Sequence, residues 1–314
     1  MVSTHGRHCV VETAQGERLI CHPRGKKLAV VVGDRVRWRP SHDEGTIEQV
    51  LSRRNLLYRQ DEVRSKSFAA NLDRALILIA AEPEFSERQL ARALIACEAA
   101  QVQPLIALNK ADLRAPFARA WQLLAPYRAM GYAVLPLAAK PRGFESNPPA
   151  ESDPGADAPP HPCALNDLLT EHLQGHTTLI LGPSGAGKST LINRLVPGAA
   201  AQTGEISQAL AAGRHTTTTT TWYWLDAAKT SALIDSPGFQ EFGLHHIEPA
   251  QLAAYMPDIR PHVAECRFYN CTHRHEPGCG VISNVESASS AGQISASRYK
   301  IYSDLWLELQ NAPR

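Results

Sequence analysis

The segment 182–190, GPSGAGKST, constrains the fold of this chain more than any other feature. An apolar strand pattern at 178–181 precedes it, and a helical pattern begins at Leu191. Between a strand and a helix, such glycines let backbone N–H groups turn inward, where they and the helix N-terminus cradle the phosphates of a nucleotide. The predicted phosphate-binding residues are Gly182, Pro183, Ser184, Gly185, Ala186, Gly187, Lys188, Ser189 and Thr190. We expect Lys188 to reach the β- and γ-phosphates and Ser189 to coordinate Mg²⁺.

A second motif, Asn109-Lys110-Ala111-Asp112, follows an apolar strand pattern at 104–108 and indicates which base is bound. The carboxylate of Asp112 can accept hydrogen bonds from N1–H and the exocyclic amine of guanine, a donor pair that adenine does not present. Asn109 and Lys110 are expected to shape the pocket. Residues 137–140 (LAAK), after the next strand, look like the backbone loop that closes over guanine in GTPases. The predicted nucleotide is therefore GTP.

Two further segments complete the predicted nucleotide site. Asp235-Ser-Pro-Gly238 follows an apolar strand at 232–234, so Asp235 is expected to hold a Mg²⁺-bound water and the Gly238 N–H to contact the γ-phosphate. The run of six threonines at 216–221 offers a hydroxyl that binds Mg²⁺ when the γ-phosphate is present. Thr216 and Thr217 are the leading candidates, and the sequence does not select between them.

The order of these motifs is unusual. The guanine motif and closing loop come first, and the phosphate loop, threonines and DSPG follow, whereas ordinary GTPases begin with the phosphate loop. Cutting the domain after the DSPG strand and joining its old ends preserves the sheet, because chain termini commonly lie close together. We therefore predict a circularly permuted domain, in which the DSPG segment leads directly into the C-terminal residues.

Between 71 and 234 the apolar pattern alternates between strands and helices, which predicts a parallel sheet and an α/β fold class. Residues 141–162 interrupt it with seven prolines and few large apolar residues, so we expect a flexible insertion there. The expected strands are 75–80, 104–108, 133–137, 178–181 and 232–234, and the expected helices are 86–100, 115–130 and 164–173.

The first 70 residues are basic, with 13 Lys and Arg against 8 Asp and Glu, and they read as short strands. Five such strands suggest a small OB-type β-barrel, a fold that often binds oligonucleotides. Strict alternation in Arg35-Val36-Arg37-Trp38-Arg39 places three arginines on one face. This face is either simply solvated or contacts the phosphates of a nucleic acid, and the sequence leaves both readings open. The expected strands are 7–12, 18–22, 29–32, 35–39 and 46–51.

Near the C-terminus, three cysteines and one histidine lie within 14 residues: Cys266, Cys271, His273 and Cys279. Three thiolates and one imidazole match a closed tetrahedral zinc site of structural type. His275 is a rival ligand to His273 that spacing does not exclude. A final helix, expected at 294–310, places aromatic residues on one side, which most simply packs against this zinc-binding part.

Composition and the chain start indicate the cellular setting. No apolar run approaches the roughly 18 residues that a membrane span needs, so no membrane role is expected. The first residues lack the apolar region of a secretory signal, which favours the cytoplasm. The seven cysteines, an odd number of which three cluster, favour free thiols and one metal site over disulfides.

Several features occur together in this chain: the N-terminal barrel pattern, NKAD before GPSGAGKST, then GRHTTT, DSPG, and CRFYNCTH with a later PGC. In this combination the chain resembles the RsgA (YjeQ/YloQ) family of GTPases. The resemblance covers nearly the whole chain. It implies a GTPase stimulated by the small (30S) ribosomal subunit that assists late maturation of that subunit and contacts its 16S rRNA through the barrel and the zinc domain. The chain departs from the family in the insertion at 141–162, in Ala138 where Ser is usual, and in the long threonine run.

On this resemblance the chain divides into an OB-fold RNA-binding domain (1–68), a circularly permuted GTPase domain (69–250) and a zinc-binding helical domain (251–314). It implies one structural Zn²⁺, Mg²⁺ with GTP, GDP as product, and a protein that is expected to act as a monomer. There are two rival functions. One is an RNA-binding assembly scaffold with a structural nucleotide. The other is a P-loop kinase or ATPase, and the NKAD motif disfavours this second one.

The residue that orients the attacking water is a separate question. Many GTPases place a glutamine directly after the glycine of DxxG, but here that position is Phe239, which neither donates nor accepts a hydrogen bond. The resemblance implies that His215 takes this role, since an imidazole can position or partly deprotonate a water. The competing reading is a surface histidine without a catalytic role.

Overall fold

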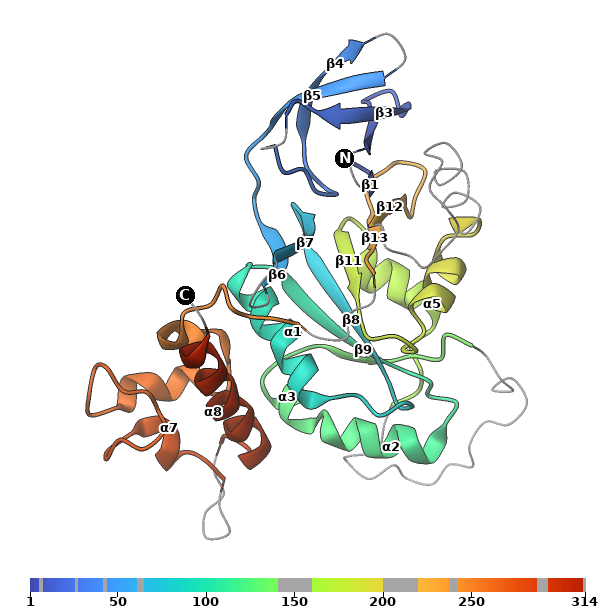
Figure 1. Cartoon of the computed structure of the whole chain (residues 1–314). Coiled ribbons are helices and arrows are strands. Elements are labelled where there is room, and N and C mark those ends of the chain that lie inside the picture. Colours follow the sequence, from blue (N-terminus) through green and yellow to red (C-terminus); the bar gives the residue numbers. More distant parts are fainter. Residues whose placement is uncertain are drawn as a thin grey trace.

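The computed structural model describes residues 1–5, 8–25, 28–41, 44–60, 65–140, 160–199, 220–237, 242–286 and 293–312. Figure 1 shows three parts: a group of N-terminal strands, a central sheet flanked by helices, and a helical C-terminal part beside helix α1. Most of the predicted insertion at 141–162 lies outside the described residues.

The central sheet has the predicted parallel core. Five parallel strands follow the order β10-β9-β8-β11-β13, and β12 joins β13 in the antiparallel sense. All five predicted strands of this region are confirmed, whereas β12 was not predicted. The bounds are β8 (Arg74–Ala80), β9 (Gln103–Asn109), β10 (Val134–Pro136), β11 (Thr177–Leu181), β12 (Thr221–Trp224) and β13 (Ala232–Asp235).

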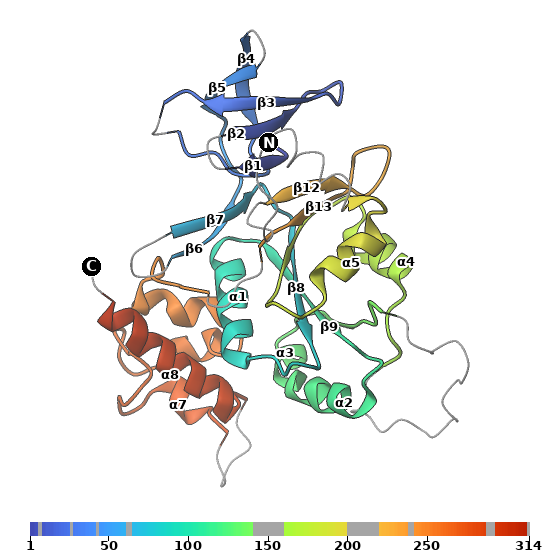
Figure 2. The same ribbon diagram turned by 45° about the vertical axis from the view of Figure 1, so that its right-hand side comes forward.

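Helices cover both faces of this sheet, because alternate residues of its buried strands point to opposite sides. Ile77 and Ile79 belong to a core shared with α1, α2 and α3, whereas Leu76 and Leu78 belong to a second core shared with α5 and η1. Figures 1 and 2 show α1 and α5 on the two sides of the sheet. The bounds are α1 (Glu87–Ala99), α2 (Arg114–Leu123), α3 (Ala125–Ala129), α4 (Leu165–Asp167), the π-helical η1 (Leu168–Leu173) and α5 (Lys188–Leu195).

Two predicted helices are broken. The expected helix at 115–130 is divided into α2 and α3 at Leu124, because Pro126 lacks the N–H that would continue the α-helical pattern and instead lies in the first turn of α3. The expected helix at 164–173 changes from the short α4 to a π-helical turn. Helix α1 agrees with the prediction, and its N-cap Ser86 accepts a hydrogen bond from the Gln89 N–H.

The N-terminal strands continue the central sheet, because β1 pairs with β12 through Ser3 and Thr221. Among the described residues, the recorded strand pairs do not close these strands into a barrel. The alternation expected at 35–39 is confirmed, with Arg37 and Arg39 exposed and Trp38 partly buried. The bounds are β1 (Ser3–His5), β2 (His8–Glu12), β3 (Arg18–Pro23), β4 (Val36–Ser41) and β5 (Glu44–Val50).

The strand predicted at 29–32 is wrong. This segment is a loop held by the buried carboxylate of Asp34, which accepts hydrogen bonds from the Val31 N–H (2.8 Å) and from Arg53 Nε (2.7 Å). The following Gly33 has a φ of +88°, and an added Cβ would lie 2.1 Å from the Ala70 carbonyl oxygen. This loop therefore packs closely against Ala70 and does not pair with another strand.

A two-stranded sheet connects the N-terminal strands to the central domain. It consists of β6 (Leu56–Gln60) and β7 (Ser65–Ala70), and it was not predicted. Phe68 stacks on Phe242 at 5.4 Å between ring centroids, and Tyr58 contacts the ring of His246 at 4.3 Å. The hairpin therefore packs against the segment that follows the DSPG motif.

The C-terminal part packs against α1 and α3. Glu308 accepts hydrogen bonds from Arg88 and Arg92 of α1, and Arg298 forms a bidentate ion pair with Asp258 and lies 5.2 Å from the ring of Tyr127. The helix predicted at 294–310 is confirmed as α8. The bounds are the 3₁₀ helices η2 (Pro249–Tyr255) and η3 (Arg260–Glu265), then α7 (Gly280–Ser283) and α8 (Ala296–Asn311). In the part of the chain that the structure describes, no helix has the length and apolar character needed to cross a bilayer.

Candidate nucleotide and metal sites

Three predicted motifs meet at one edge of the central sheet. Asn109 ends β9, the glycine-rich segment follows β11, and Asp235 ends β13. These strands run parallel, with β8 between β9 and β11, so their carboxyl ends share one edge. Ligands of open α/β sheets bind outside the carboxyl ends of the strands. The fold therefore brings the predicted guanine, phosphate and magnesium residues together.

The buried side chain of Asn109 connects two of these loops. Its Nδ2 donates to the Ala186 carbonyl in the phosphate loop at 2.8 Å, and its Oδ1 accepts from the Ala139 N–H at 2.9 Å. Asn109 is 3% exposed, so both hydrogen bonds are shielded from water. This one amide sets the position of the predicted guanine-closing loop relative to the phosphate loop.

The rest of the NKAD motif is arranged around a left-handed turn. Lys110 has a φ of +70°, and its ammonium donates to the Glu82 carbonyl. Asp112 is partly buried, and its carboxylate has no recorded hydrogen bond or ion pair to another described residue. This carboxylate is available to a ligand, as the guanine prediction requires.

The phosphate loop presents backbone donors and one partly buried cation. The first hydrogen bond leading into α5 runs from the Leu191 N–H to the Gly187 carbonyl, so the preceding N–H groups have no partner within the helix. Lys188 Nζ donates to the carbonyls of Gly182 at 2.7 Å and Pro183 at 3.2 Å, which holds its charge at the mouth of the loop. Gly187 adopts a φ of +101°, and Gly182 contacts the backbone of Leu78.

Asp235 and Lys188 are close enough for the charge of each to influence the pKa of the other. Burial raises the pKa of Asp235 to about 6, and the nearby Lys188 charge opposes this rise. Burial also lowers the pKa of Lys188, and the charge of Asp235 opposes that shift. A partly buried carboxylate next to a phosphate loop is the oxygen donor that Mg²⁺ prefers, directly or through water, and the Ser189 hydroxyl is a second such donor. The residues present therefore fit a magnesium ion.

Several predicted site residues lie outside the described residues. These are His215, Thr216, Thr217 and Gly238. Thr221, the last residue of the threonine run, is the first residue of β12 and is buried, so this end of the run belongs to the sheet. The roles expected for the other four residues stay predictions.

The sequence did not identify Arg194 as part of this region. Its Nη1 donates to the carbonyls of Ala139 at 3.0 Å and Ala138 at 3.3 Å, which braces the loop that Asn109 also holds. Arg194 lies near the end of α5, far along the chain from this loop. No local pattern predicts such a contact, because it joins residues that are 55 and 56 positions apart in the chain.

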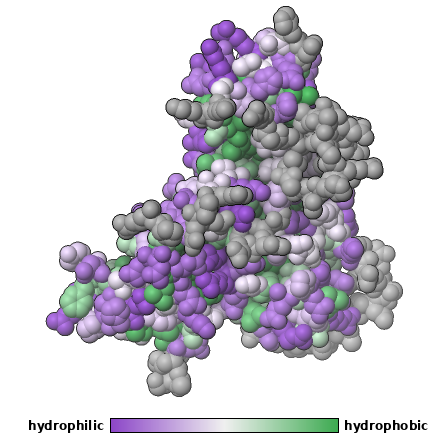
Figure 3. All heavy atoms as spheres, in the orientation of Figure 1, coloured by the Kyte–Doolittle hydropathy of each residue, from purple (hydrophilic) through white to green (hydrophobic). Residues whose placement is uncertain are grey.

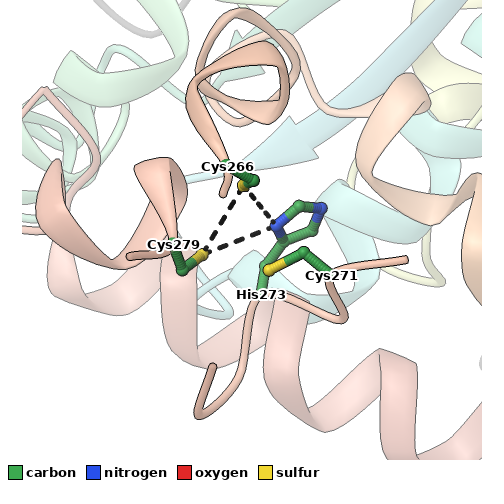
Figure 4. Close-up of side chains that lie close together, drawn as sticks. All are labelled: Cys266, Cys271, His273 and Cys279. Atoms are coloured by element: carbon green, nitrogen blue, oxygen red, sulfur yellow. Dashed lines mark hydrogen bonds between the residues drawn. The ribbon is translucent and has the colours of Figure 1, made fainter. Parts of the chain in front are cut away.

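The predicted metal ligands converge in the C-terminal part (Figure 4). One ligand atom from each of Cys266, Cys271, His273 and Cys279 lies within 4.8 Å of the others. Cys266 Sγ is 3.4 Å from His273 Nδ1 and 3.9 Å from Cys279 Sγ, and Cys279 Sγ is 3.6 Å from the same nitrogen. A tetrahedron with metal–sulfur bonds of about 2.3 Å has edges of about 3.8 Å. The cluster therefore fits a zinc ion in both donor type and spacing.

Neighbouring groups fix the loop that carries these ligands. Tyr302 Oη donates to the Thr272 carbonyl and Tyr299 Oη to the His273 carbonyl, each at 3.0 Å, which confirms that the aromatic side of α8 packs on this part. Burial alone would raise the pKa of Glu276, but hydrogen bonds from Thr272 and Arg274 outweigh it and lower that pKa. His273, with a φ of +58°, joins the cysteines, whereas its rival His275 does not belong to the cluster.

The pKa values of Cys271 and Cys279 are shifted toward the protonated form. Burial raises the pKa of Cys271 to about 12 and also raises that of Cys279. Zinc binds the thiolate form, so binding at neutral pH releases protons from these groups. Three thiols held this close together are costly to ionise without a cation, which favours a metal-bound state.

Comparison with known proteins agrees with this geometry. The sequence profile of the RsgA GTPase family matches residues 50–146 and 163–245. The chain belongs to the RsgA GTPase family. The profile leaves 147–162 unmatched, so most of the proline-rich insertion lies outside the family's common sequence.

Curated proteins that are named RsgA match this chain along nearly its whole length. The small ribosomal subunit biogenesis GTPase RsgA of Variovorax paradoxus (strain S110) is 64% identical over 312 residues, which cover 99% of this chain and 92% of the relative. The protein of the same name from Burkholderia pseudomallei (strain 1710b) is 49% identical over 307 residues, covering 97% and 90%.

Two solved structures have the same fold. The crystal structure of YjeQ from Thermotoga maritima matches with a TM-score of 0.71 and 28% identity, covering 99% of this chain and 98% of that one. YloQ, described as a circularly permuted GTPase, matches with a TM-score of 0.66 and 25% identity, covering 100% and 95%. The predicted circular permutation is therefore confirmed for this RsgA family member.

The close approach of Gly187 to Asn109 leads to the first prediction. Gly187→Ala is expected to weaken GTP binding by about 10²-fold, because the new Cβ would lie 2.4 Å from Asn109 Nδ2 and displace the amide that joins the two loops. Calorimetric titration with GTP measures the effect. The matched control is Gly198→Ala, since Gly198 has a similar φ of +86° but no atom within 4 Å of an added Cβ. Equal affinities for the two variants would contradict the prediction.

The cysteine cluster leads to the second prediction. Protein purified without chelator is expected to retain about one zinc ion per chain after desalting, and Cys279→Ser is expected to lose it, because a hydroxyl replaces one thiolate ligand. Elemental analysis measures the metal content. Cys163→Ser is the control, since Cys163 is a free thiol outside the cluster and should leave the zinc content unchanged. Wild-type protein without stoichiometric metal would refute the assignment.

Proposed function

We propose that this chain binds GTP, hydrolyses it to GDP and phosphate, and thereby assists late maturation of the small (30S) ribosomal subunit. The observation that carries the proposal is the Asn109 side chain, which joins a guanine motif to a phosphate loop in the permuted order of its family. The curated relatives are named small ribosomal subunit biogenesis GTPases, and they match over nearly the full length of this chain.

In this proposal each motif of the nucleotide site has a role. Asp112 would accept hydrogen bonds from guanine, and the backbone around Ala139 would close over the base while Asn109 and Lys110 hold the pocket. The backbone N–H groups of 182–190 and the Lys188 ammonium would bind the phosphates. These roles are supported by geometry: the Asp112 carboxylate has no hydrogen bond to another described residue, and the phosphate loop offers helix N-terminal donors and a cation.

Mg²⁺ would accompany GTP and neutralise developing phosphate charge. In this proposal Ser189 and Thr216 or Thr217 coordinate the ion, Asp235 holds one of its waters, and the Gly238 N–H contacts the γ-phosphate. The support is the partly buried carboxylate of Asp235 at the carboxyl end of β13, whose pKa is influenced by the charge of Lys188.

For the chemical step, we assign the positioning of the attacking water to His215. Phe239 occupies the place of the usual glutamine and cannot form a hydrogen bond through its side chain. His215 adjoins the threonines that are expected to close on the γ-phosphate, so binding to the ribosome would bring the imidazole to the water. Intrinsic turnover would then be slow.

The remaining parts would provide ribosome contacts. We propose domains at 1–68, 69–250 and 251–314, with the first an OB-type barrel that binds 16S rRNA and the third a zinc-binding domain. The exposed Arg37 and Arg39 on β4, together with the basic charge of the first 70 residues, support contact with phosphates. We further propose that the protein acts as a monomer in the cytoplasm.

The central experiment compares turnover of GTP and ATP with and without purified small ribosomal subunits. We expect slow hydrolysis of GTP that the subunits accelerate, and no comparable hydrolysis of ATP. Hydrolysis that subunits leave unchanged would remove the ribosomal part of the proposal, and negligible hydrolysis with tight nucleotide binding would favour an assembly scaffold. Preference for ATP would indicate a P-loop kinase or ATPase.

The same assay tests the catalytic residue. His215→Ala is expected to lower the subunit-stimulated kcat by about 10²-fold while GTP affinity stays nearly unchanged, because no ground-state phosphate contact is lost. His161→Ala, which changes an exposed histidine outside the motifs, is the control. Full stimulated turnover of His215→Ala would assign the water-positioning role to another group.

Base recognition gives the last prediction for this site. Asp112→Asn is expected to weaken GTP binding and to shift preference toward xanthosine triphosphate, whose oxygen at the 2-position accepts a hydrogen bond from an amide. Competitive titration with both nucleotides measures the change. Asp167→Asn, at an exposed residue of α4, should leave the preference for GTP intact. Unchanged selectivity in Asp112→Asn would exclude the proposed contact.

A further inference from the structure

A second group of metal-ligating side chains lies on the N-terminal strands, away from the cysteine cluster. It consists of His8 on β2, His22 on β3 and Glu44 on β5. One nitrogen of each imidazole and one carboxylate oxygen lie within 4.8 Å of one another. Neither the nucleotide site nor the cysteine cluster uses these residues.

The register of three neighbouring strands brings these side chains together. Cys9 pairs with Cys21 across β2 and β3, and Cys21 pairs with Gly45 across β3 and β5. Cys9 and Cys21 point inward, where they form a small core with Ile47. Because successive residues of a strand point to opposite faces, His8, His22 and Glu44 share the outer face. A shift of the strand register by one residue would turn these polar side chains into the core. The packing of the small core therefore also fixes the positions of the two histidines.

Contacts on the outer face order the three side chains. His22 Nδ1 is 2.9 Å from Glu44 Oε2, and the rings of His8 and His22 lie 6.0 Å apart at 67°. The side chains of His22 and Glu44 are 45% and 36% exposed, and His8 is exposed as well. A cation from solvent can therefore reach ligands that are already close together. In Figure 3 hydrophilic side chains predominate over the outermost N-terminal strands.

We propose that His8, His22 and Glu44 form a binding site for a divalent transition-metal ion such as Zn²⁺. Two imidazoles and one carboxylate are a known three-ligand set for zinc, which leaves the fourth position to water. Imidazole favours zinc, copper and nickel, whereas Mg²⁺ and Ca²⁺ prefer sites made of oxygen atoms alone. The ion would connect β2, β3 and β5 on their exposed side.

Binding of the ion requires rotation of the three ligand side chains and no movement of the strands. Metal–ligand bonds of about 2.0–2.1 Å give tetrahedral edges of about 3.3 Å. The separation of 2.9 Å between His22 and Glu44 is already close to this edge, and the ligand atom of His8 is within 4.8 Å of both. The three ligands come together only when β2, β3 and β5 are paired in this register. The bound ion should therefore stabilise these strands against unfolding.

Calorimetric titration of the full-length protein with Zn²⁺ tests this proposal, after the tightly bound zinc content has been measured. Wild-type protein is expected to bind one additional equivalent. His8→Ala and His22→Ala are each expected to weaken this additional binding at least about tenfold, since even outer-shell partners of metal ligands contribute 10–100-fold. The control His161→Ala, at an exposed histidine elsewhere, should bind the additional ion as the wild type does.

The variants change exposed side chains, so folding is verified by basal GTP turnover equal to that of the wild type. The proposal is overturned if wild-type protein takes up no additional equivalent. It is also overturned if His8→Ala and His22→Ala bind Zn²⁺ as tightly as His161→Ala, because the ion would then be held elsewhere. Neither result bears on GTP hydrolysis or on the cysteine cluster.

Discussion

The hydrogen bonds of the Asn109 amide are the interaction on which the nucleotide site depends. In this permuted chain the guanine motif and the phosphate loop are far apart in sequence, so noncovalent contacts must set their relative position. The parallel strands bring the two loops to one edge, and Asn109 fixes them through Ala186 and Ala139. Both partners are buried, and each unpaired backbone group would cost about 1–3 kcal/mol. The two loops predicted to recognise the base and to bind the phosphates are therefore held together by one side chain.

The segment after the DSPG motif connects the nucleotide site to both outer parts of the molecule. Phe242 stacks on Phe68 of the β6–β7 hairpin, and its carbonyl accepts a hydrogen bond from Arg92 of α1. Leu244 forms an isolated bridge with Gln60. Arg92 also pairs with Glu308 of α8, so the same arginine contacts this segment and the C-terminal helix. A rearrangement near Asp235 would reach the β6–β7 hairpin and the C-terminal part through one short stretch of chain.

The sequence predicted the parts of this fold whose signals are local. Apolar runs bounded by loops predicted the strands that end at Asn109 and Asp235, and close ligand spacing predicted the cysteine cluster. Predictions failed where distant contacts decide. Residues 29–32 look like a strand, but the buried Asp34 and its contact with Arg53 hold them as a loop. Strand β12 was missed although its partner β13 follows it directly in the chain; its other partner, β1, lies at the start of the chain.

The loop at Ala138 and Ala139 has a consequence for natural variation. Asn109 and Arg194 hold it through one backbone N–H and two backbone carbonyls, and neither contact involves a side chain of the loop itself. Every amino acid except proline supplies those groups. The loop can therefore change in sequence while residues elsewhere in the chain keep its backbone in the same shape.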